Sequence, residues 1–146
     1  MRVCIIGGGA SGLYCALHIK KLSPETEVTI LEKQPRVGKK LLATGNGRCN
    51  FTNRNQTIDF YTSEMSDMAF SIIQMHNADD IIKVFSEIGV EATSIGTLVY
   101  PRSLQASSVL DALRFKTEAL SVNIRTDCSV KSIKKDFFLI RLKCKC

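Results

Sequence analysis

The 146-residue sequence lacks the long apolar run that marks a membrane protein. No stretch approaches the roughly 18 to 20 apolar residues needed to cross a bilayer. The start, "MRVCIIGGG", has no small-residue cleavage site after a longer apolar stretch, as a signal peptide would. These absences predict a cytoplasmic protein with no membrane partner. The 45% hydrophobic content is that of a folded protein, and we expect one domain over residues 1–146.

Paired cysteines and clustered histidines are also missing. The cysteines form no CxxC pair and show no regular spacing, so neither a metal site nor a disulfide framework is predicted. Cys4 in an apolar strand and Cys15 on the apolar face of the next helix are expected to act as small hydrophobic residues. His18 and His76 have no acid or cysteine at a spacing that would make a triad or a metal site, so structural roles are expected for both.

The net charge of +6 is unevenly distributed. Residues 33–54 carry six basic and no acidic residues, residues 55–130 carry five basic and ten acidic, and residues 131–146 carry six basic and one acidic. The first basic segment suits a phosphate-bearing ligand, although a solvated surface explains its lysines equally well. The basic tail lacks a recognised nucleic-acid motif, and Phe137 and Phe138 resemble strand residues rather than a stacking platform, so no nucleic-acid partner is predicted.

Apolar periodicity predicts an α/β fold. "RVCII" reads as a buried parallel strand, residues 10–22 as a helix, and "EVTILE" as a second strand. Helices are expected near residues 65–75, 79–88 and 105–120, with Gly89 capping the second. "VEATSIGTLVYP" predicts a hairpin turning near Ile95 and Gly96, "VNIRT" a third parallel strand, and "SVKSIKK" with "FFLIRLK" an antiparallel ribbon.

The turn after the first strand carries a dinucleotide-binding pattern. "GGGASG" places Gly7, Gly9 and Gly12 in the order G-x-G-x-x-G between a strand and a helix. Gly7 permits a tight turn, Gly9 leaves room for a pyrophosphate, and Gly12 lets the helix pack close to the strand. The helix N-terminus at Ala10 and Ser11 then offers N–H groups to phosphate oxygens.

Glu32 follows Gly12 by twenty positions, at the end of the second predicted strand. A carboxylate there accepts hydrogen bonds from ribose hydroxyls and repels a 2′-phosphate, which favours FAD or NAD over NADP at this site. Because FAD and NAD share the same ADP half, these residues do not separate them.

Two longer stretches carry a family resemblance. "EKQPRVGKKLLATGNGRCNFTN" and "GTLVYPRSLQASSVLDAL" resemble segments of the BaiN-like (YhiN-type) family of NAD(P)/FAD-dependent oxidoreductases, which carry G-[KR]-K and then S-G-G-G-R-C-N-x-[ST]-N. Thr44 and Asn46 stand where that family more often has serine and glycine, and Asn46 is expected to tolerate a positive φ.

The resemblance implies a Rossmann-like FAD-binding domain with a parallel sheet, in which NAD(P)H is the reductant and a small organic molecule the acceptor. The polar loop around Gly45 and Gly47 would approach the flavin, with Asn50 and Asn53 bracing it. The implied cofactor-binding residues are Gly7, Gly9, Ala10, Ser11, Gly12, Glu32, Lys33, Lys40, Gly45, Gly47, Arg48, Cys49, Asn50 and, through its backbone at the adenine edge, Val130. No catalytic acid or base is predicted.

The same resemblance predicts that the chain is incomplete at its C-terminus, without the segments that close the FAD site and without the substrate domain. Alone it is then expected to be inactive. Two alternatives stay open: a non-catalytic remnant that binds a nucleotide weakly or folds in part, and a fragment of an NAD-dependent dehydrogenase. The oligomeric state is not predicted.

Two further positions have competing interpretations. Cys49 is adjacent to Arg48 in the loop, where a redox role competes with a packing role, and the absence of a nearby resolving cysteine favours packing. Tyr100 and Arg102 flank Pro101, where either contact with a substrate or an ordinary hairpin end is expected.

Overall fold

The computed structural model describes residues 1–134 and 139–144, and it divides into two compact units. The first unit comprises Met1–Leu42 and Leu113–Cys146, and the second comprises Ala43–Ala112. The expectation of one domain over residues 1–146 stays a prediction, and each unit is described by itself below.

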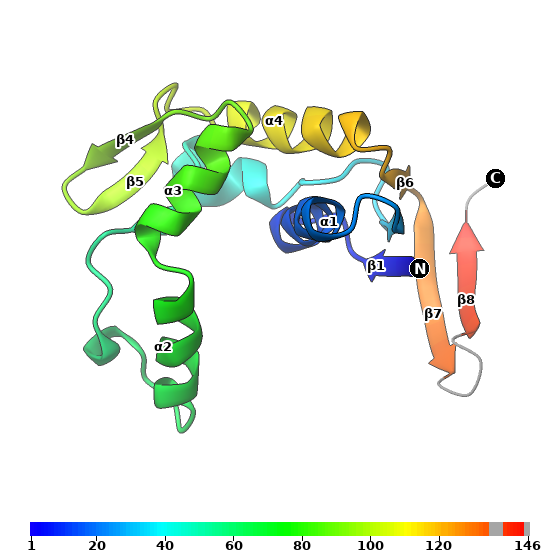
Figure 1. The fold of residues 1–146 in the computed structure, drawn as a ribbon, viewed down its shortest axis with the longest axis horizontal. Helices are drawn as coiled ribbons and strands as arrows, with labels where there is room; N and C mark the ends of the chain where they lie inside the picture. The colour runs from blue at the N-terminus through cyan, green and yellow to red at the C-terminus, as the bar shows by residue number, and fades with distance from the viewer. Residues whose placement is uncertain (135–138, 145–146) are drawn as a thin grey trace. The chain divides into compact units, whose positions relative to one another are not determined.

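The first unit contains the predicted βαβ arrangement (Figure 1). Its elements are β1 (Arg2–Ile6), α1 (Ala10–Leu22), β2 (Glu27–Leu31) and β6 (Asn123–Arg125). The strands form a parallel sheet in the order β1-β2-β6, with Arg2 opposite Glu27 and Thr29 opposite Asn123. The α/β fold and the third parallel strand are therefore confirmed.

The prediction that the first strand is buried is wrong. Exposed and half-buried residues alternate along β1, and Cys4 and Ile6 are exposed. Within the described sheet β1 is an edge strand, with β2 as its neighbour. The stripe that α1 buries consists of Leu13, Ala16 and Leu17.

The predicted burial of Cys15 is wrong as well, because that side chain is exposed. At about 100° per residue, Cys15 lies on the side of α1 opposite Leu13. Neither Cys4 nor Cys15 therefore acts as a core residue in this structure.

The chain continues into an antiparallel ribbon of β7 (Cys128–Lys134) and β8 (Leu139–Cys144), as predicted (Figure 1). The register of β7 shifts between Val130 and Ser132, which marks a bulge or a comparable irregularity. Phe137 and Phe138, expected as strand residues, lie outside the described part of the chain.

The second unit holds an antiparallel sheet in the order β3-β5-β4. Its strands are β3 (Thr52–Asn53), β4 (Ala92–Ile95) and β5 (Leu98–Pro101). Ile95 pairs with Leu98, so the hairpin turns at Gly96 and Thr97, one residue later than predicted, and Gly96 has φ +60°. Two 3-10 segments, η1 (Leu41–Gly47) and η2 (Ile58–Phe60), precede the helices.

The helices follow the predicted positions closely. They are α2 (Ser66–Met75), α3 (Ala78–Glu87) and α4 (Ala106–Ala119), which begins in the second unit and ends in the first. The Asn77 side chain accepts hydrogen bonds from the N–H groups of Asp79 and Asp80, and the Asp80 carboxylate accepts one from the Asn77 N–H, which forms a capping box on α3. Gly89, with φ +86°, ends α3 as predicted.

Helix α2 differs from the others because none of its residues is buried. Four large apolar side chains in and next to it are more than half exposed: Met65, Met68, Ile72 and Met75.

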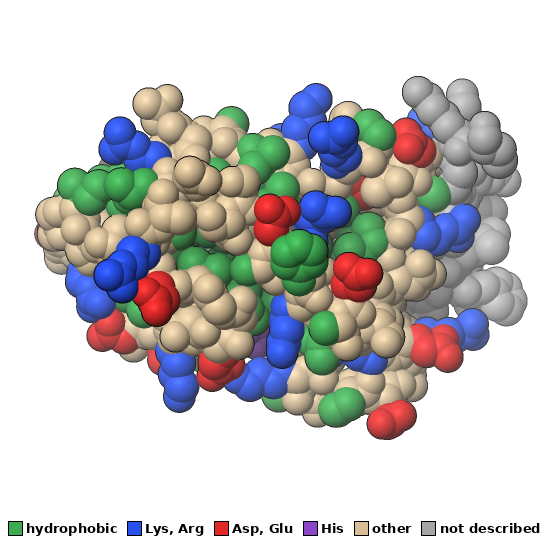
Figure 2. Space-filling model, turned by 90° about the horizontal axis from the view of Figure 1, so that it is seen from above, with side chains coloured by type: hydrophobic (Ala, Val, Ile, Leu, Met, Phe, Trp, Pro, Cys, Tyr) green, Lys and Arg blue, Asp and Glu red, His purple; other side chains and the backbone are tan. Residues whose placement is uncertain are grey.

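Figure 2 shows hydrophobic side chains among the charged ones on one face of the molecule. Within the described residues, no helix has both the length and the apolarity that crossing a membrane requires.

Candidate functional site: a glycine turn and a polar loop

The turn between β1 and α1 has the geometry that its glycines predict. Gly7 has φ +102°, a conformation that favours glycine. A Cβ added at Gly12 would lie 2.0 Å from the Gly7 carbonyl oxygen, so the start of α1 approaches the turn too closely for any side chain. A Cβ at Gly9 would meet no atom within 4 Å. The turn is thus crowded at Gly12 and open at Gly9.

The first turn of α1 has backbone donors available. The first regular helical bond runs from the Leu13 N–H to the Gly9 carbonyl, so the N–H groups of Ala10, Ser11 and Gly12 have no partner inside the helix. No side chain caps this end, and no acidic residue lies in the first turn. Such an end is complementary to an anion, and the open space at Gly9 adjoins it.

Glu32 is bonded to the same turn. One carboxylate oxygen of Glu32 accepts a hydrogen bond from the Gly8 N–H at 2.8 Å, and the other accepts one from the Gln34 N–H at 2.8 Å. Each oxygen has a second lone pair, so the carboxylate retains acceptor capacity for a further donor such as a hydroxyl. The side chain expected to bind a ribose is thereby held against the turn expected to bind phosphates.

Sequence reasoning missed the central glycine and the segment that packs on it. A Cβ at Gly8 would lie 2.4 Å from a methyl carbon of Val37, and the Gly8 carbonyl accepts a hydrogen bond from the Gly38 N–H at 2.7 Å. The sequence signal was Gly8 itself, a glycine at a position where the pattern G-x-G-x-x-G allows any residue.

Three further residues of the first unit were predicted to contact the cofactor: Lys33, Lys40 and Val130. Lys33 and Lys40 are both exposed. Val130 is half-buried and pairs with Leu142 of β8, next to the register shift. A cofactor contact by any of these three residues stays a prediction.

The polar loop of the second unit is an ordered and strongly turned segment. Gly45, Asn46, Gly47 and Cys49 all have positive φ angles, and the 54° at Asn46 is the value expected from its place in the family pattern. The N–H of Cys49 donates to the Thr44 carbonyl, and that of Arg48 donates to the Gly45 carbonyl. Arg48 is exposed.

Amide side chains fix this loop to the sheet. The Asn50 Nδ2 donates to the carbonyls of Thr52 and Val99, both at 2.9 Å, and the Asn53 Oδ1 accepts from the Asn55 N–H. A Cβ at Gly45 would lie 2.6 Å from the backbone nitrogen of Asn50 and 3.4 Å from a ring carbon of Tyr100. Both donors of the Asn50 amide are thus used within the second unit. A contact from Gly45, Gly47, Arg48, Cys49 or Asn50 to a cofactor stays a prediction.

Cys49 has the environment of a packing residue. Its side chain is buried, and desolvation raises the pKa of the thiol, against a smaller lowering by a hydrogen bond with Thr44. A raised pKa leaves less thiolate, which is the reactive form. The packing role is therefore the better supported of the two interpretations.

The two histidines differ in their surroundings. His18 shares a hydrogen bond between its Nδ1 and the Tyr14 carbonyl, and the two rings lie 4.3 Å apart between centroids. His76 follows the last residue of α2 and is exposed. Among the described residues, no group of three or more His, Cys, Asp or Glu side chains is arranged to hold a metal ion.

Solved structures with the same fold include a flavocytochrome. A flavocytochrome c3 fumarate reductase aligns with a TM-score of 0.60 at 14% identity, covering 91% of this chain and 28% of that one. The THI4 protein of Thermovibrio ammonificans aligns with a TM-score of 0.58 at 16% identity, covering 97% and 45%. At these identities the likeness shows the fold alone.

Relatives in sequence are closer. A 3-dehydro-bile acid delta(4,6)-reductase of Clostridium scindens is 38% identical over 133 residues, which are 91% of this chain and 32% of the relative. A ribosomal RNA dihydrouridine synthase of Haemophilus influenzae is 36% identical over 86 residues, which are 59% and 21%. The chain therefore spans about a third of the length of the longer match.

The HI0933-like protein Rossmann domain matches residues 1–145. The resemblance read from the glycine turn and the polar loop is confirmed by this match and by the bile acid reductase. A parallel β1-β2-β6 sheet with a glycine turn before α1 is the structure that such a domain requires. On these grounds, the chain belongs to the HI0933-like Rossmann domain family.

Proposed function

We propose that this chain is the FAD-binding part of a flavin-dependent oxidoreductase. The diphosphate of FAD would lie over Gly9, with the N–H groups of Ala10, Ser11 and Gly12 as donors. Glu32 would accept hydrogen bonds from the hydroxyls of the adenosine ribose. FAD supplies the hydride transfer, from NAD(P)H to an organic acceptor such as a conjugated C=C bond.

The hydrogen bond from the Gly8 N–H to Glu32 carries this proposal. It joins residues 24 positions apart, and it orients a carboxylate beside an open and uncapped helix end. Those two features are the separate requirements of an ADP half, a ribose acceptor and a phosphate cradle. A structural role alone would not require the space at Gly9 to be empty.

The choice of FAD over NAD rests on the family. The ADP half is the same in both, so Gly7 to Gly12 and Glu32 fit either cofactor. The flavin-dependent family pattern extends through the polar loop, and a solved flavocytochrome shares the fold. Since the chain spans about a third of the bile acid reductase, we propose that the reductant site and the substrate site require further polypeptide.

A titration of the purified chain with FAD and with NAD tests the proposal. Flavin fluorescence should change saturably with FAD, and NAD should compete weakly. Gly9→Ala should weaken FAD binding by about tenfold or more, which corresponds to roughly 1.4 kcal/mol, because the added methyl enters the space assigned to the diphosphate. Gly9 has φ −78°, so alanine is tolerated there without backbone strain.

The control is Ser107→Ala, which places the same methyl side chain at an exposed position of α4 outside the turn. Equal FAD affinity for the parent chain and Gly9→Ala would contradict the proposed diphosphate position. Absence of FAD binding by a chain that unfolds cooperatively would favour the non-catalytic remnant. Tighter binding of NAD than of FAD would favour the dehydrogenase fragment.

A second candidate is the reduction of a base in RNA. The ribosomal RNA dihydrouridine synthase is one of the relatives, and all six basic residues of 33–54 are exposed: Lys33, Arg36, Lys39, Lys40, Arg48 and Arg54. We favour a small organic acceptor because the bile acid reductase is 38% identical, whereas a ribosomal RNA dihydrouridine synthase of Escherichia coli that matches a similar share of the chain is 28% identical. Filter binding with a ribosomal RNA fragment separates them. RNA binding should weaken steeply between about 50 and 200 mM salt, by a factor that grows with the number of phosphate contacts.

A further inference from the structure

A pocket in the second unit has chemistry that the proposed FAD site does not use. Its volume is about 420 Å³, and residues from three segments line it: Gly89, Val90, Glu91, Pro101, Arg102, Ser103 and Ser108. These segments are the loop between α3 and β4, the end of β5 with the two residues that follow it, and the first turn of α4. All lining residues belong to the second unit, so the pocket is a feature of that unit alone.

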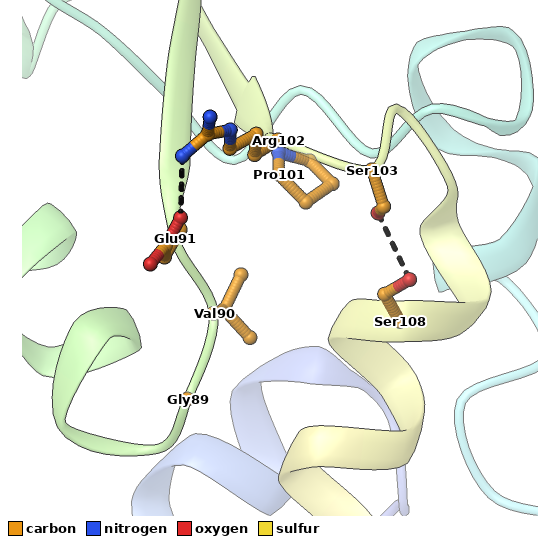
Figure 3. A pocket seen from close by; sticks show the side chains of 7 residues that line it. All are labelled: Gly89, Val90, Glu91, Pro101, Arg102, Ser103 and Ser108. Atoms are coloured by element: carbon orange, nitrogen blue, oxygen red, sulfur yellow. Dashed lines mark hydrogen bonds and ion pairs between the residues drawn. The ribbon is translucent and has the colours of Figure 1, made fainter.

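Two polar pairs face each other across an apolar floor (Figure 3). On one side the Arg102 Nη1 donates to a Glu91 carboxylate oxygen at 2.9 Å. On the other side the hydroxyls of Ser103 and Ser108 lie 2.9 Å apart. The side chains of Val90 and Pro101 lie between the pairs, and both residues are buried.

The donors exceed the acceptors in this pocket. A guanidinium has five N–H donors, and the bond to Glu91 uses one, through Nη1. In the serine pair one hydroxyl donates to the other, which leaves the second hydroxyl proton for an outside acceptor. The available donors therefore come from Arg102 and one serine, on opposite sides of the pocket.

The ion pair with Glu91 orients the guanidinium of Arg102 but offsets its positive charge only weakly. The ion pair is largely exposed, with 76% of the Arg102 side chain and 70% of the Glu91 side chain accessible. Exposed ion pairs contribute little net free energy because water screens both charges. A bidentate oxyanion is a better partner for a guanidinium than one carboxylate oxygen, and it can compete here.

We propose that this pocket binds the carboxylate or phosphate group of a small ligand, through Arg102 and the Ser108 hydroxyl, whose proton is left available by the bond from Ser103. Val90 and Pro101 contact the apolar part of that ligand next to its charged group. The volume is within the range of small-molecule sites, about 300–1,000 Å³. The site is independent of FAD, so a failure of FAD binding leaves its test intact.

The probes are inorganic phosphate and sodium acetate, titrated into the isotope-labelled chain by NMR at constant ionic strength, with sodium chloride as the blank. The expected result is a saturable shift of the Ser103 and Ser108 amides and of the Arg102 Nε signal. Saturation by phosphate alone, by acetate alone or by both supports the site and assigns its preferred charged group. Shifts that do not saturate, or that chloride reproduces, overturn the proposal.

Three substitutions sharpen the test. Arg102→Gln should weaken binding about tenfold or more, and Ser108→Ala should weaken it severalfold. Glu91→Gln should tighten binding of the anion, because it removes the competing negative charge. Weaker binding of phosphate and acetate by Glu91→Gln would overturn the proposal.

Arg54→Gln is the matched control. Arg54 also donates through Nη1 to an exposed carboxylate, that of Asp79, but it does not line the pocket. Anion affinity should be unchanged in Arg54→Gln. An equal loss in Arg54→Gln and Arg102→Gln would mean that general surface charge binds the anion, which overturns the site. Unchanged thermal midpoints in all four variants exclude misfolding as the cause.

Discussion

Gly9 and Gly12 occupy the same sequence pattern for opposite physical reasons. An added methyl group at Gly9 would enter empty space, whereas one at Gly12 would overlap the Gly7 carbonyl oxygen. In the proposed function, the missing side chain at Gly9 leaves room for the ligand, whereas at Gly12 the close packing of α1 on the turn requires it to be missing. Substitutions at the two positions should separate binding from stability.

Gly12→Ala should lower the free energy of unfolding by roughly 1–3 kcal/mol or more, because the backbone oxygen that it meets cannot move aside as a flexible side chain would. Chemical denaturation with the parent chain and Gly9→Ala alongside measures this change. Gly9→Ala should keep the parent stability to within about 0.5 kcal/mol. A stable Gly12→Ala would show that α1 shifts away from β1 more easily than the packing indicates.

The cysteines should differ in reactivity according to burial. Cys15 is exposed, Cys49 and Cys128 are buried, and desolvation raises the pKa of the thiols of Cys4 and Cys49. Among these four cysteines, limited alkylation near neutral pH should therefore label Cys15 first, Cys4 more slowly, and the two buried residues last. Because a raised pKa shifts thiolate formation to higher pH, labelling of Cys4 should become faster as the pH rises. Peptide mass spectrometry reads the order, and early labelling of Cys49 would revive a redox role for it.

Individual residues also show which features could be predicted from the sequence and which could not. The roles of Gly7 and Gly12 follow from local steric rules, so they were predictable from a pattern. The contact of Gly8 with Val37 was not, because it depends on where a later segment returns over the turn. The exposure of Cys15 was missed because helical spacing fixes its angle only once the buried stripe is known.

Among the elements, α2 is the one that departs from the usual use of an amphipathic helix. Met65, Met68, Ile72 and Met75 recur at spacings of three and four, so they line one side of the helix. That side is exposed, although such a stripe normally packs on a core. Acidic residues Glu64 and Asp67 lie beside it.

Met68→Lys should reduce self-association without loss of stability. The Met68 side chain is 56% exposed, so little packing is removed, and a charge in the stripe opposes apolar contact between molecules. Sedimentation velocity across protein concentrations measures association. Gln74→Lys adds the same charge at an exposed position outside the stripe and should leave association unchanged. Equal effects of both variants would attribute the change to net charge rather than to the stripe.

Element boundaries were predicted well where a single residue, such as a glycine, marks the end of a helix or a turn. Gly89 ends α3 and the turn at Gly96 closes the hairpin, since positive φ at a glycine is encoded in the residue itself. The burial of β1 was predicted wrongly, because an apolar run does not reveal which strands flank it. The cap at Asn77 was not identified in advance, although Asn followed three residues later by Asp is a recognisable variant of the capping box.

For the whole molecule, FAD is expected to act as a stabilising ligand. A ligand that binds the folded state at 100 times its dissociation constant adds about 2.7 kcal/mol to the free energy of unfolding. Hydrogen exchange with and without FAD should show protection at the N–H groups of Ala10, Ser11 and Gly12. Strands β4 and β5 of the second unit serve as the internal reference. Protection there and not at the glycine turn would place the cofactor elsewhere.

The architecture was predictable to different degrees in its two units. The βαβ order and the parallel pairing follow from the alternation of strand and helix patterns, and the structure confirms them. The pairing of β3 with β5, and the pocket beside Arg102, could not be read from the sequence. Both depend on contacts between segments that no local rule connects, such as Thr52 with Val99 and Ser103 with Ser108.

The outer flank of β1 has one further consequence. In the described sheet this strand bonds to β2 on one side, so its other side offers peptide groups that any extended polypeptide can match. Peptide groups are chemically alike in every sequence. An incoming strand would therefore be chosen by its length and by the shape that it turns toward Cys4 and Ile6, rather than by a recognition motif.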